Sequence, residues 1–176
     1  MKKDTISISV TGHRPSKLIG GYDLNSEGNL KIKEIMILLI EKILETRADN
    51  VVCYSGMALG IDSIFADAVL TVKNKYPENI KLICAIPFEN QSIKWVPESV
   101  DFYNAVLDFA DEVINTSGEK NYEPKYMQIR NMYMVDNSDI VIAFWDGSSG
   151  GTANCVKYAQ KKGKPIVFRK EGLLPY

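Results

Sequence analysis

A glycine-rich segment late in the chain, DGSSGGT at 146–152, has the composition of a phosphate-binding loop. It contains three glycines and several hydroxyl side chains, and it stands between an apolar run and a segment with helical spacing. Backbone N–H groups at a helix start of this kind can bind an anion. No lysine precedes the Ser or Thr, so this is not a Walker A motif, and an ordinary glycine-rich turn is the alternative. The candidate ligand-binding residues here are Asp146, Gly147, Ser149, Gly150, Gly151 and Thr152.

A second segment of small residues, SGMALGID at 55–62, also lies between an apolar run and a helical pattern. Its small side chains let backbone N–H groups approach an anion at the helix N-terminus. Asp62 falls in the first helical turn, where a carboxylate interacts favourably with the helix dipole. In a binding role, Asp62 would instead accept hydrogen bonds from a ribose hydroxyl or a base. The candidates here are Ser55, Gly56, Met57, Gly60 and Asp62.

The segment TGHRP at 11–15 follows the first apolar run. Gly12 permits a tight turn or the close approach of a ligand. Arg14 can pair with a phosphate through two parallel hydrogen bonds. The alternative is a plain turn with two exposed polar side chains. The candidates here are Gly12, His13 and Arg14.

The segment PFENQ at 87–91, with Trp95 close behind it, follows the third apolar run. A flat aromatic side chain beside amides suits the face and the edge of a purine. The alternative is a hydrophobic plug that covers the end of the sheet. The candidates here are Pro87, Phe88, Gln91 and Trp95.

Short β-rich runs alternate with segments of helical periodicity, and this alternation decides where the four segments lie. Several runs are almost continuously apolar, as expected for a parallel sheet covered on both faces. The sequence therefore predicts one α/β domain over 1–176, a Rossmann-like, mostly parallel, doubly wound sheet with helices on both faces. Ligands of such folds bind outside the carboxyl ends of the strands, where all four segments would lie. The expected strands are 6–10, 51–55, 81–86, 112–115, 140–145 and 165–169, and the expected helices are 32–44, 61–72, 97–110, 124–137 and 152–162.

The bulk composition argues against several classes of protein. A net charge of −1 and a pI of about 5.9 give no global basic field, so we expect no nucleic-acid partner. No apolar stretch reaches the roughly 20 residues that span a bilayer, so we expect no membrane association. Three cysteines without CxxC spacing and a single histidine predict a reduced, cytoplasmic protein without a metal site.

The four segments, in their order along nearly the whole chain, resemble the YpsA-like branch of the SLOG superfamily, which joins the DprA/Smf proteins with the Lonely-guy proteins. The motifs that carry the resemblance are TGHRP, SGMALGID, AIPFENQ and SD-IVIAFWDG-SSGGT. This resemblance implies a variant of the Rossmann fold with a pocket for nucleotides or their derivatives.

The Lonely-guy enzymes cut the N-glycosidic bond of nucleoside 5′-monophosphates, and the chain matches only part of their signature. Arg130 stands ahead of Ser138-Asp139 at the family's spacing, and Gly151-Thr152 match its GT pair. The signature's proline is absent, and its catalytic Glu falls on Cys155. A thiol cannot replace a carboxylate that stabilises an oxocarbenium-like centre or activates water. The resemblance thus implies a retained binding site, which includes Arg130, without the hydrolase's carboxylate.

We therefore expect a sensor or sequestering protein for a nucleotide or an NAD-derived, ADP-ribose-like molecule, with no required cofactor. The resemblance and the apolar helix faces favour a homo-oligomer in the cytoplasm of a bacterial or phage-infected cell. The alternative is a phosphoribohydrolase of Lonely-guy type that uses another carboxylate. Its candidate catalytic residues are Asp62, Glu89 and Arg130, with Asp146 as a further carboxylate. A DprA-like binder of single-stranded DNA is disfavoured, and the lysines at 161, 162 and 164 are interpreted as a solvated helix end.

Overall fold

The computed structural model describes residues 1–175 and contains one six-stranded sheet, in which every pair of neighbouring strands is parallel. The strands lie in the order β4-β3-β2-β1-β5-β6. The fold expected from the sequence is confirmed, and the sheet is wholly rather than mostly parallel. The strands are β1 (Lys3–Gly12), β2 (Ala48–Ser55), β3 (Ile80–Ile86), β4 (Glu112–Asn115), β5 (Ile140–Phe144) and β6 (Ile166–Arg169).

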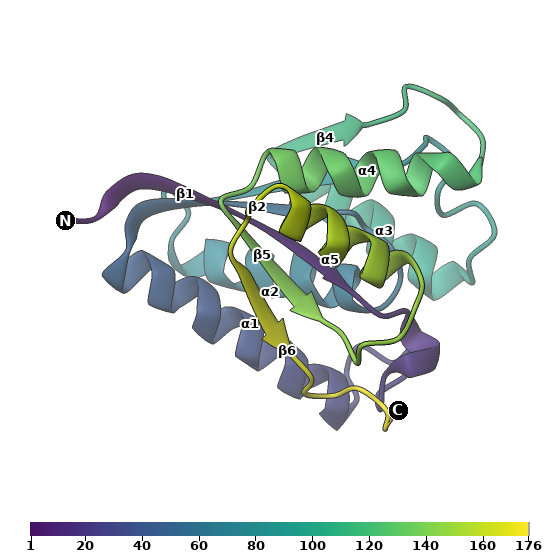
Figure 1. The fold of residues 1–176 in the computed structure, drawn as a ribbon. Helices are drawn as coiled ribbons and strands as arrows, with labels where there is room; N and C mark the ends of the chain where they lie inside the picture. The colour runs from purple at the N-terminus through teal and green to yellow at the C-terminus, as the bar shows by residue number, and fades with distance from the viewer. Residues whose placement is uncertain (176) are drawn as a thin grey trace.

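The helices cover both faces of this sheet (Figure 1), with α1, α2 and α3 on one face and α4 and α5 on the other. A short 3-10 helix, η1 (Pro15–Lys17), follows β1. No helix within residues 1–175 is both long and apolar enough to cross a membrane. The helices are α1 (Glu27–Thr46), α2 (Ile61–Lys75), α3 (Pro97–Phe109), α4 (Pro124–Asp136) and α5 (Gly151–Lys161).

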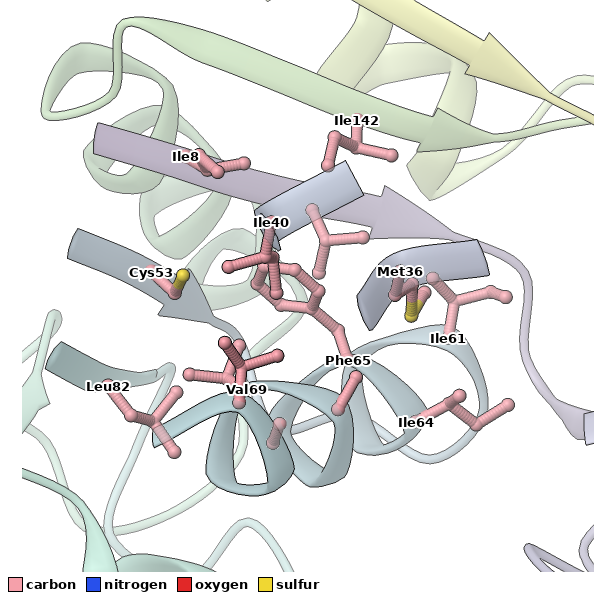
Figure 2. Close-up of a cluster of buried hydrophobic side chains, with 14 of the residues drawn as sticks. Ile8, Met36, Ile40, Cys53, Ile61, Ile64, Phe65, Val69, Leu82 and Ile142 are labelled. Carbon is pink, nitrogen blue, oxygen red and sulfur yellow. The ribbon is translucent and has the colours of Figure 1, made fainter. Parts of the chain in front are cut away.

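The larger part of the core lies between the sheet and the α1–α3 layer. Figure 2 shows Phe65 of α2 among aliphatic side chains from α1 and from the central strands, including Ile40 and Ile8. On the opposite face a smaller cluster joins Cys155 of α5 to Val135 and Val141. Because both faces are covered, all five residues of β5 are buried, which explains its continuously apolar sequence.

The strand order creates a switch point between β1 and β5. From β1 the chain winds outward through β2, β3 and β4, and it then returns through α4 to place β5 on the other side of β1. The connections on the two sides of β1 use helices on opposite faces of the sheet, so a crevice opens beyond the carboxyl ends of β1 and β5. Ligands of doubly wound folds bind in this crevice.

Candidate functional site

A cavity of about 370 Å³ lies at this switch point. Its walls come from the segment after β1, the start of α2, the middle of α4 and the start of α5. Three of the four sequence-predicted segments therefore meet at one place. The fourth, the β3 segment (PFENQ at 87–91, which follows β3), does not line this cavity. The lining residues are Val10, Thr11, Gly12, His13, Arg14, Ser16, Lys17, Ala58, Asp62, Met127, Arg130, Asn131, Ser149, Gly150, Gly151 and Thr152.

The N-terminus of α5 opens on this cavity. Gly150, the N-cap residue, has φ 136°, a backbone conformation that residues with a side chain rarely adopt. No side chain within residues 1–175 caps the helix, so its first N–H groups keep their capacity to bind. A Cβ atom at Gly150 or Gly151 would have no neighbour within 4 Å. The glycines here leave open space in front of a helix N-terminus, which is the arrangement that binds phosphate oxygens.

The glycines of the other two segments are needed for packing. Gly60 has φ 94°, and a Cβ there would collide with the carbonyl oxygen of His13. The Ile61 N–H donates to that oxygen at 3.2 Å, and a Cβ at Gly12 would lie 2.6 Å from the Ile61 side chain. These glycines let the segment after β1 press against the start of α2. They shape the floor of the cavity rather than opening it.

A buried ion pair lies at the back of the cavity. The Arg130 side chain donates from Nη1 to the Gly56 carbonyl oxygen at 2.5 Å and from Nε to Asn131 Oδ1 at 3.0 Å. Its Nη1 lies 3.8 Å from Asp62 Oδ2. Burial raises the pKa of Asp62, although Arg130 and Arg14 oppose this. Gly56 is a glycine because a Cβ there would collide with the Arg130 guanidinium.

The mouth of the cavity is basic. Arg14 is exposed at its rim, and within residues 1–175 its side chain has no hydrogen-bond or ion-pair partner. Lys17 also lines the cavity, with its Nζ 3.3 Å from Asp146 Oδ2. Arg14, Lys17 and Arg130 thus place three cationic side chains around one cavity, and among residues 1–175 the only carboxylate that lines it is Asp62.

Asp146 and Gly147 do not line the cavity, although both were expected to bind ligand. Asp146 holds the glycine-rich segment in shape by accepting from the Ser148 N–H at 2.8 Å and by lying 2.9 Å from His13 Nε2. Burial raises the pKa of its carboxyl, but the hydrogen bonds from Ser148, together with His13 and Lys17, have the larger, opposite effect. The pKa of Asp146 therefore lies well below its usual range. Asp146 is a positioning residue for the segment that precedes α5.

Several further candidates lie beneath the site or away from it. Ser55 Oγ donates to the Asp62 carbonyl oxygen at 2.8 Å and accepts from the Met57 N–H at 3.2 Å, so both residues brace the start of α2. Glu89 is exposed, with its Oε1 4.0 Å from Lys120 Nζ, and it does not reach the cavity as a catalytic carboxylate. Of the remaining candidates that follow β3, Phe88, Gln91 and Trp95 line a separate cavity. Pro87 does not line that cavity.

Sequence reasoning missed several residues of the cavity wall. On α4, Met127 lies three residues before Arg130, a spacing that shares a helix face, and Asn131 directly follows Arg130. The three-residue spacing could have identified Met127 once Arg130 was a candidate. Ser16 and Lys17 lie in η1, for which the sequence pattern gave no signal. Within residues 1–175, no group of three His, Cys, Asp or Glu side chains gathers as a metal site.

Cys155 occupies α5 beneath the cavity, and its environment disfavours a nucleophile. Its side chain is buried, and burial raises the pKa of its thiol to about 11, although Thr11 and Arg130 oppose the shift. At neutral pH only about 10⁻³ to 10⁻⁴ of such a thiol is thiolate, the reactive form.

We expect that no cysteine of the native protein reacts with Ellman's reagent at neutral pH, because Cys53, Cys84 and Cys155 are all buried. The same assay in concentrated urea should count all three thiols. Fast modification of Cys155 before unfolding, identified by peptide mapping, would contradict this environment.

These features define a Rossmann-like α/β protein whose basic cavity lies at the switch point of a doubly wound sheet. The sequence pattern of the YspA SLOG family matches residues 8–167, and the chain belongs to this family. It is 38% identical over 142 residues to the uncharacterized SPbeta prophage-derived protein YoqJ of Bacillus subtilis strain 168, which covers 75% of this chain and 82% of YoqJ. It is 28% identical over 158 residues to a UPF0398 protein of Bacillus cereus strain G9842, which covers 89% of this chain and 84% of the relative.

A solved structure shares the fold. DNA processing protein A from Helicobacter pylori, described for its single-stranded DNA binding mode, superposes with a TM-score of 0.63 at 20% sequence identity, covering 95% of this chain and 68% of that one. This finding overturns our expectation that nucleic acid is not a partner. The expectation was wrong because net charge averages over the whole surface. It does not register a local cluster of cations such as Arg14, Lys17 and Arg130.

Proposed function

We propose that the switch-point cavity binds the phosphate of a nucleotide or of a nucleotide-derived molecule such as ADP-ribose, and that the protein senses or sequesters this ligand. The observation that carries the proposal is the uncapped N-terminus of α5, which opens on a cavity with Arg14 at its rim. Backbone N–H groups bind the phosphate oxygens, and the guanidinium of Arg14 pairs with them from the solvent side.

The charges around the cavity favour an anion over a neutral ligand. Arg130 is buried and already donates to Gly56 and Asn131, so it contributes mainly a fixed positive field. The Arg14 side chain has no hydrogen-bond or ion-pair partner among residues 1–175, so it is free to move onto a ligand. The Asp62 carboxylate lies 3.8 Å from the buried Arg130 guanidinium, which offsets the negative charge that an entering phosphate meets. The Asp62 carboxylate is available to a ribose hydroxyl.

A second candidate function is hydrolysis of the glycosidic bond, and the observation that favours it is the Asp62 carboxyl, which lines the cavity and whose pKa burial raises. A carboxyl with a raised pKa can act as a general acid. Glycosidic cleavage by the common routes uses two carboxyl groups. In the part of the chain that the structure describes, Asp62 is the only carboxylate that lines this cavity, and the Lonely-guy catalytic position holds the buried Cys155. Binding without turnover is therefore the function we propose.

Incubation with candidate ligands separates the two functions. We expect protein at near-stoichiometric concentration to retain AMP, GMP or ADP-ribose through rapid gel filtration, and chromatography of the denatured complex to recover the ligand intact. If the wild type releases free base over several turnovers and Asp62→Asn does not, the protein is a hydrolase instead.

Because the fold is shared with a binder of single-stranded DNA, the incubation experiment also needs a single-stranded DNA ligand. A phosphodiester presents the same oxygens to the α5 N-terminus as a free nucleotide does, so the incubation should include a short single-stranded oligonucleotide. Displacement of the retained mononucleotide by the oligonucleotide would place a strand in the cavity. Retention of the mononucleotide at a large excess of oligonucleotide would limit the ligand to small molecules.

A further inference from the structure

The residues that follow β3 line a cavity of their own, about 560 Å³ in volume, between the loops that follow β3 and β4. We propose that this cavity is a second binding site, and that it takes a nucleobase ring. Three aromatic side chains line it, Phe88, Trp95 and Tyr122. The proposal does not depend on the function proposed for the switch-point cavity, because the two cavities share no lining residue.

Of the three aromatic side chains, Tyr122 and Trp95 keep exposed surface. Phe88 is buried and meets the Tyr122 ring edge-on, with centroids 5.7 Å apart and an interplanar angle of 69°. Tyr122 remains 62% exposed. Trp95 is half-buried and meets Tyr103 edge-on, with centroids 5.2 Å apart. A ring with exposed surface, as Tyr122 and the half-buried Trp95 have, can stack on a flat heterocycle, which every nucleobase provides.

Two amide side chains give the cavity a polar edge. Asn90 Nδ2 donates to Asn121 Oδ1 at 3.0 Å, which fixes both amides. Within residues 1–175, the other two amide atoms have no protein partner: Asn90 Oδ1, an acceptor, and Asn121 Nδ2, a donor. An acceptor beside a donor complements the edge of a nucleobase, as amide side chains do when they recognise adenine.

Gln91, which we expected to contact the base, has no such freedom. Its Nε2 donates to the Gly56 carbonyl oxygen at 3.0 Å, and its Oε1 accepts from the Tyr103 hydroxyl at 3.1 Å. The same Gly56 oxygen accepts from Arg130. Gln91 therefore forms part of the wall between the two cavities, and the asparagines are the residues that face a ligand.

Backbone hydrogen bonds join the two loops, so the site exists before a ligand arrives. The Glu89 N–H donates to the Glu119 carbonyl oxygen at 3.0 Å, and the Asn90 N–H donates to that of Lys120 at 2.9 Å. Asn115 Nδ2 adds a bond to the Glu119 oxygen at 2.9 Å. A preformed site loses less conformational entropy when it binds.

Tryptophan fluorescence tests the proposal, because the chain has only two tryptophans. In Trp145→Phe the remaining reporter, Trp95, lies in the proposed site. We expect saturable quenching by at least one of adenosine, guanosine, cytidine and thymidine, with a Kd of about 1 mM or below, after correction for absorption with free N-acetyltryptophanamide. These probes carry no phosphate, so they do not test the switch-point cavity.

Two variants in this background locate the bound nucleoside. Tyr122→Ala should weaken binding about tenfold through the loss of a stacking surface, whereas Phe109→Ala, which removes a similarly exposed aromatic from the end of α3, should leave it unchanged. Gly151→Val should also leave the nucleoside affinity unchanged. The proposal is overturned by the absence of saturable quenching up to about 10 mM of all four nucleosides. Equal affinities in Tyr122→Ala and Phe109→Ala, or loss of quenching in Gly151→Val, would also overturn it.

Discussion

Replacing Arg130 with methionine is expected to lower the free energy of unfolding by about 3–5 kcal/mol, because breaking a buried ion pair leaves an uncompensated charge. The Arg130 side chain is 4% exposed. Without it, the Asp62 carboxyl loses the nearest cation and the Gly56 carbonyl oxygen loses a charged donor. Methionine keeps much of the side-chain volume, so the loss measures electrostatics more than packing.

Urea unfolding followed by circular dichroism measures this loss, with Arg47→Met as the matched control. Arg47 is an exposed arginine at the end of α1, and its replacement should change the free energy of unfolding by no more than about 0.5 kcal/mol. Adding Asp62→Asn to Arg130→Met should restore part of the loss, because the unpaired carboxylate is then gone. Equal stability of Arg130→Met and Arg47→Met would show that the pair contributes nothing.

Replacing Gly151 with valine is expected to weaken phosphate-ligand binding by at least about 100-fold while leaving the protein folded. Gly151 is the first residue of α5 and lines the cavity, and a Cβ there has no neighbour within 4 Å. The valine side chain would therefore occupy the space in front of the helix N-terminus without displacing protein atoms. We therefore expect Gly151→Val to weaken ligand binding without lowering the stability of the fold.

Calorimetry with the nucleotide retained in the incubation experiment measures the affinity of Gly151→Val. Gln160→Val is the matched control, since it places the same branched side chain at an exposed position of the same helix. Its affinity should match that of the wild type. An unchanged affinity in Gly151→Val would remove the α5 N-terminus from the binding site.

Most of the fold could be predicted from the sequence, because its local patterns agree with its final packing. Every strand expected from an apolar run formed within a few residues of its expected bounds, as did the helix from 97 and the helix from 124. Capping and breaking residues explain this accuracy. Pro97 and Pro124 each occupy the first turn of a helix, where the missing N–H costs nothing.

The site was predicted only in part, because the sequence does not reveal which strands become neighbours. All four segments were expected at one pocket. The β3 segment instead lies beyond β2, two strands away from β1, and it lines a different cavity. The order of strands depends on long-range packing that no local pattern encodes.

Composition also cannot distinguish an open glycine from a packed one. Gly12, Gly56 and Gly60 lie against other atoms and shape the protein, whereas Gly150 and Gly151 face open space. In the sequence both groups appear as similar glycine-rich segments after a strand. Their separation required the positions of His13, Ile61 and Arg130, which are distant in the chain.

Mass spectrometry of the small molecules released by denaturing the purified protein tests the central claim most directly. We predict that the wild type releases a phosphate-bearing molecule of nucleotide type, and that Gly151→Val, purified in the same way from the same cells, releases little or none of it. Release of the same molecule in equal amount from Gly151→Val, or of a molecule that carries no phosphate, would contradict the assignment of the switch-point cavity as a nucleotide-phosphate site.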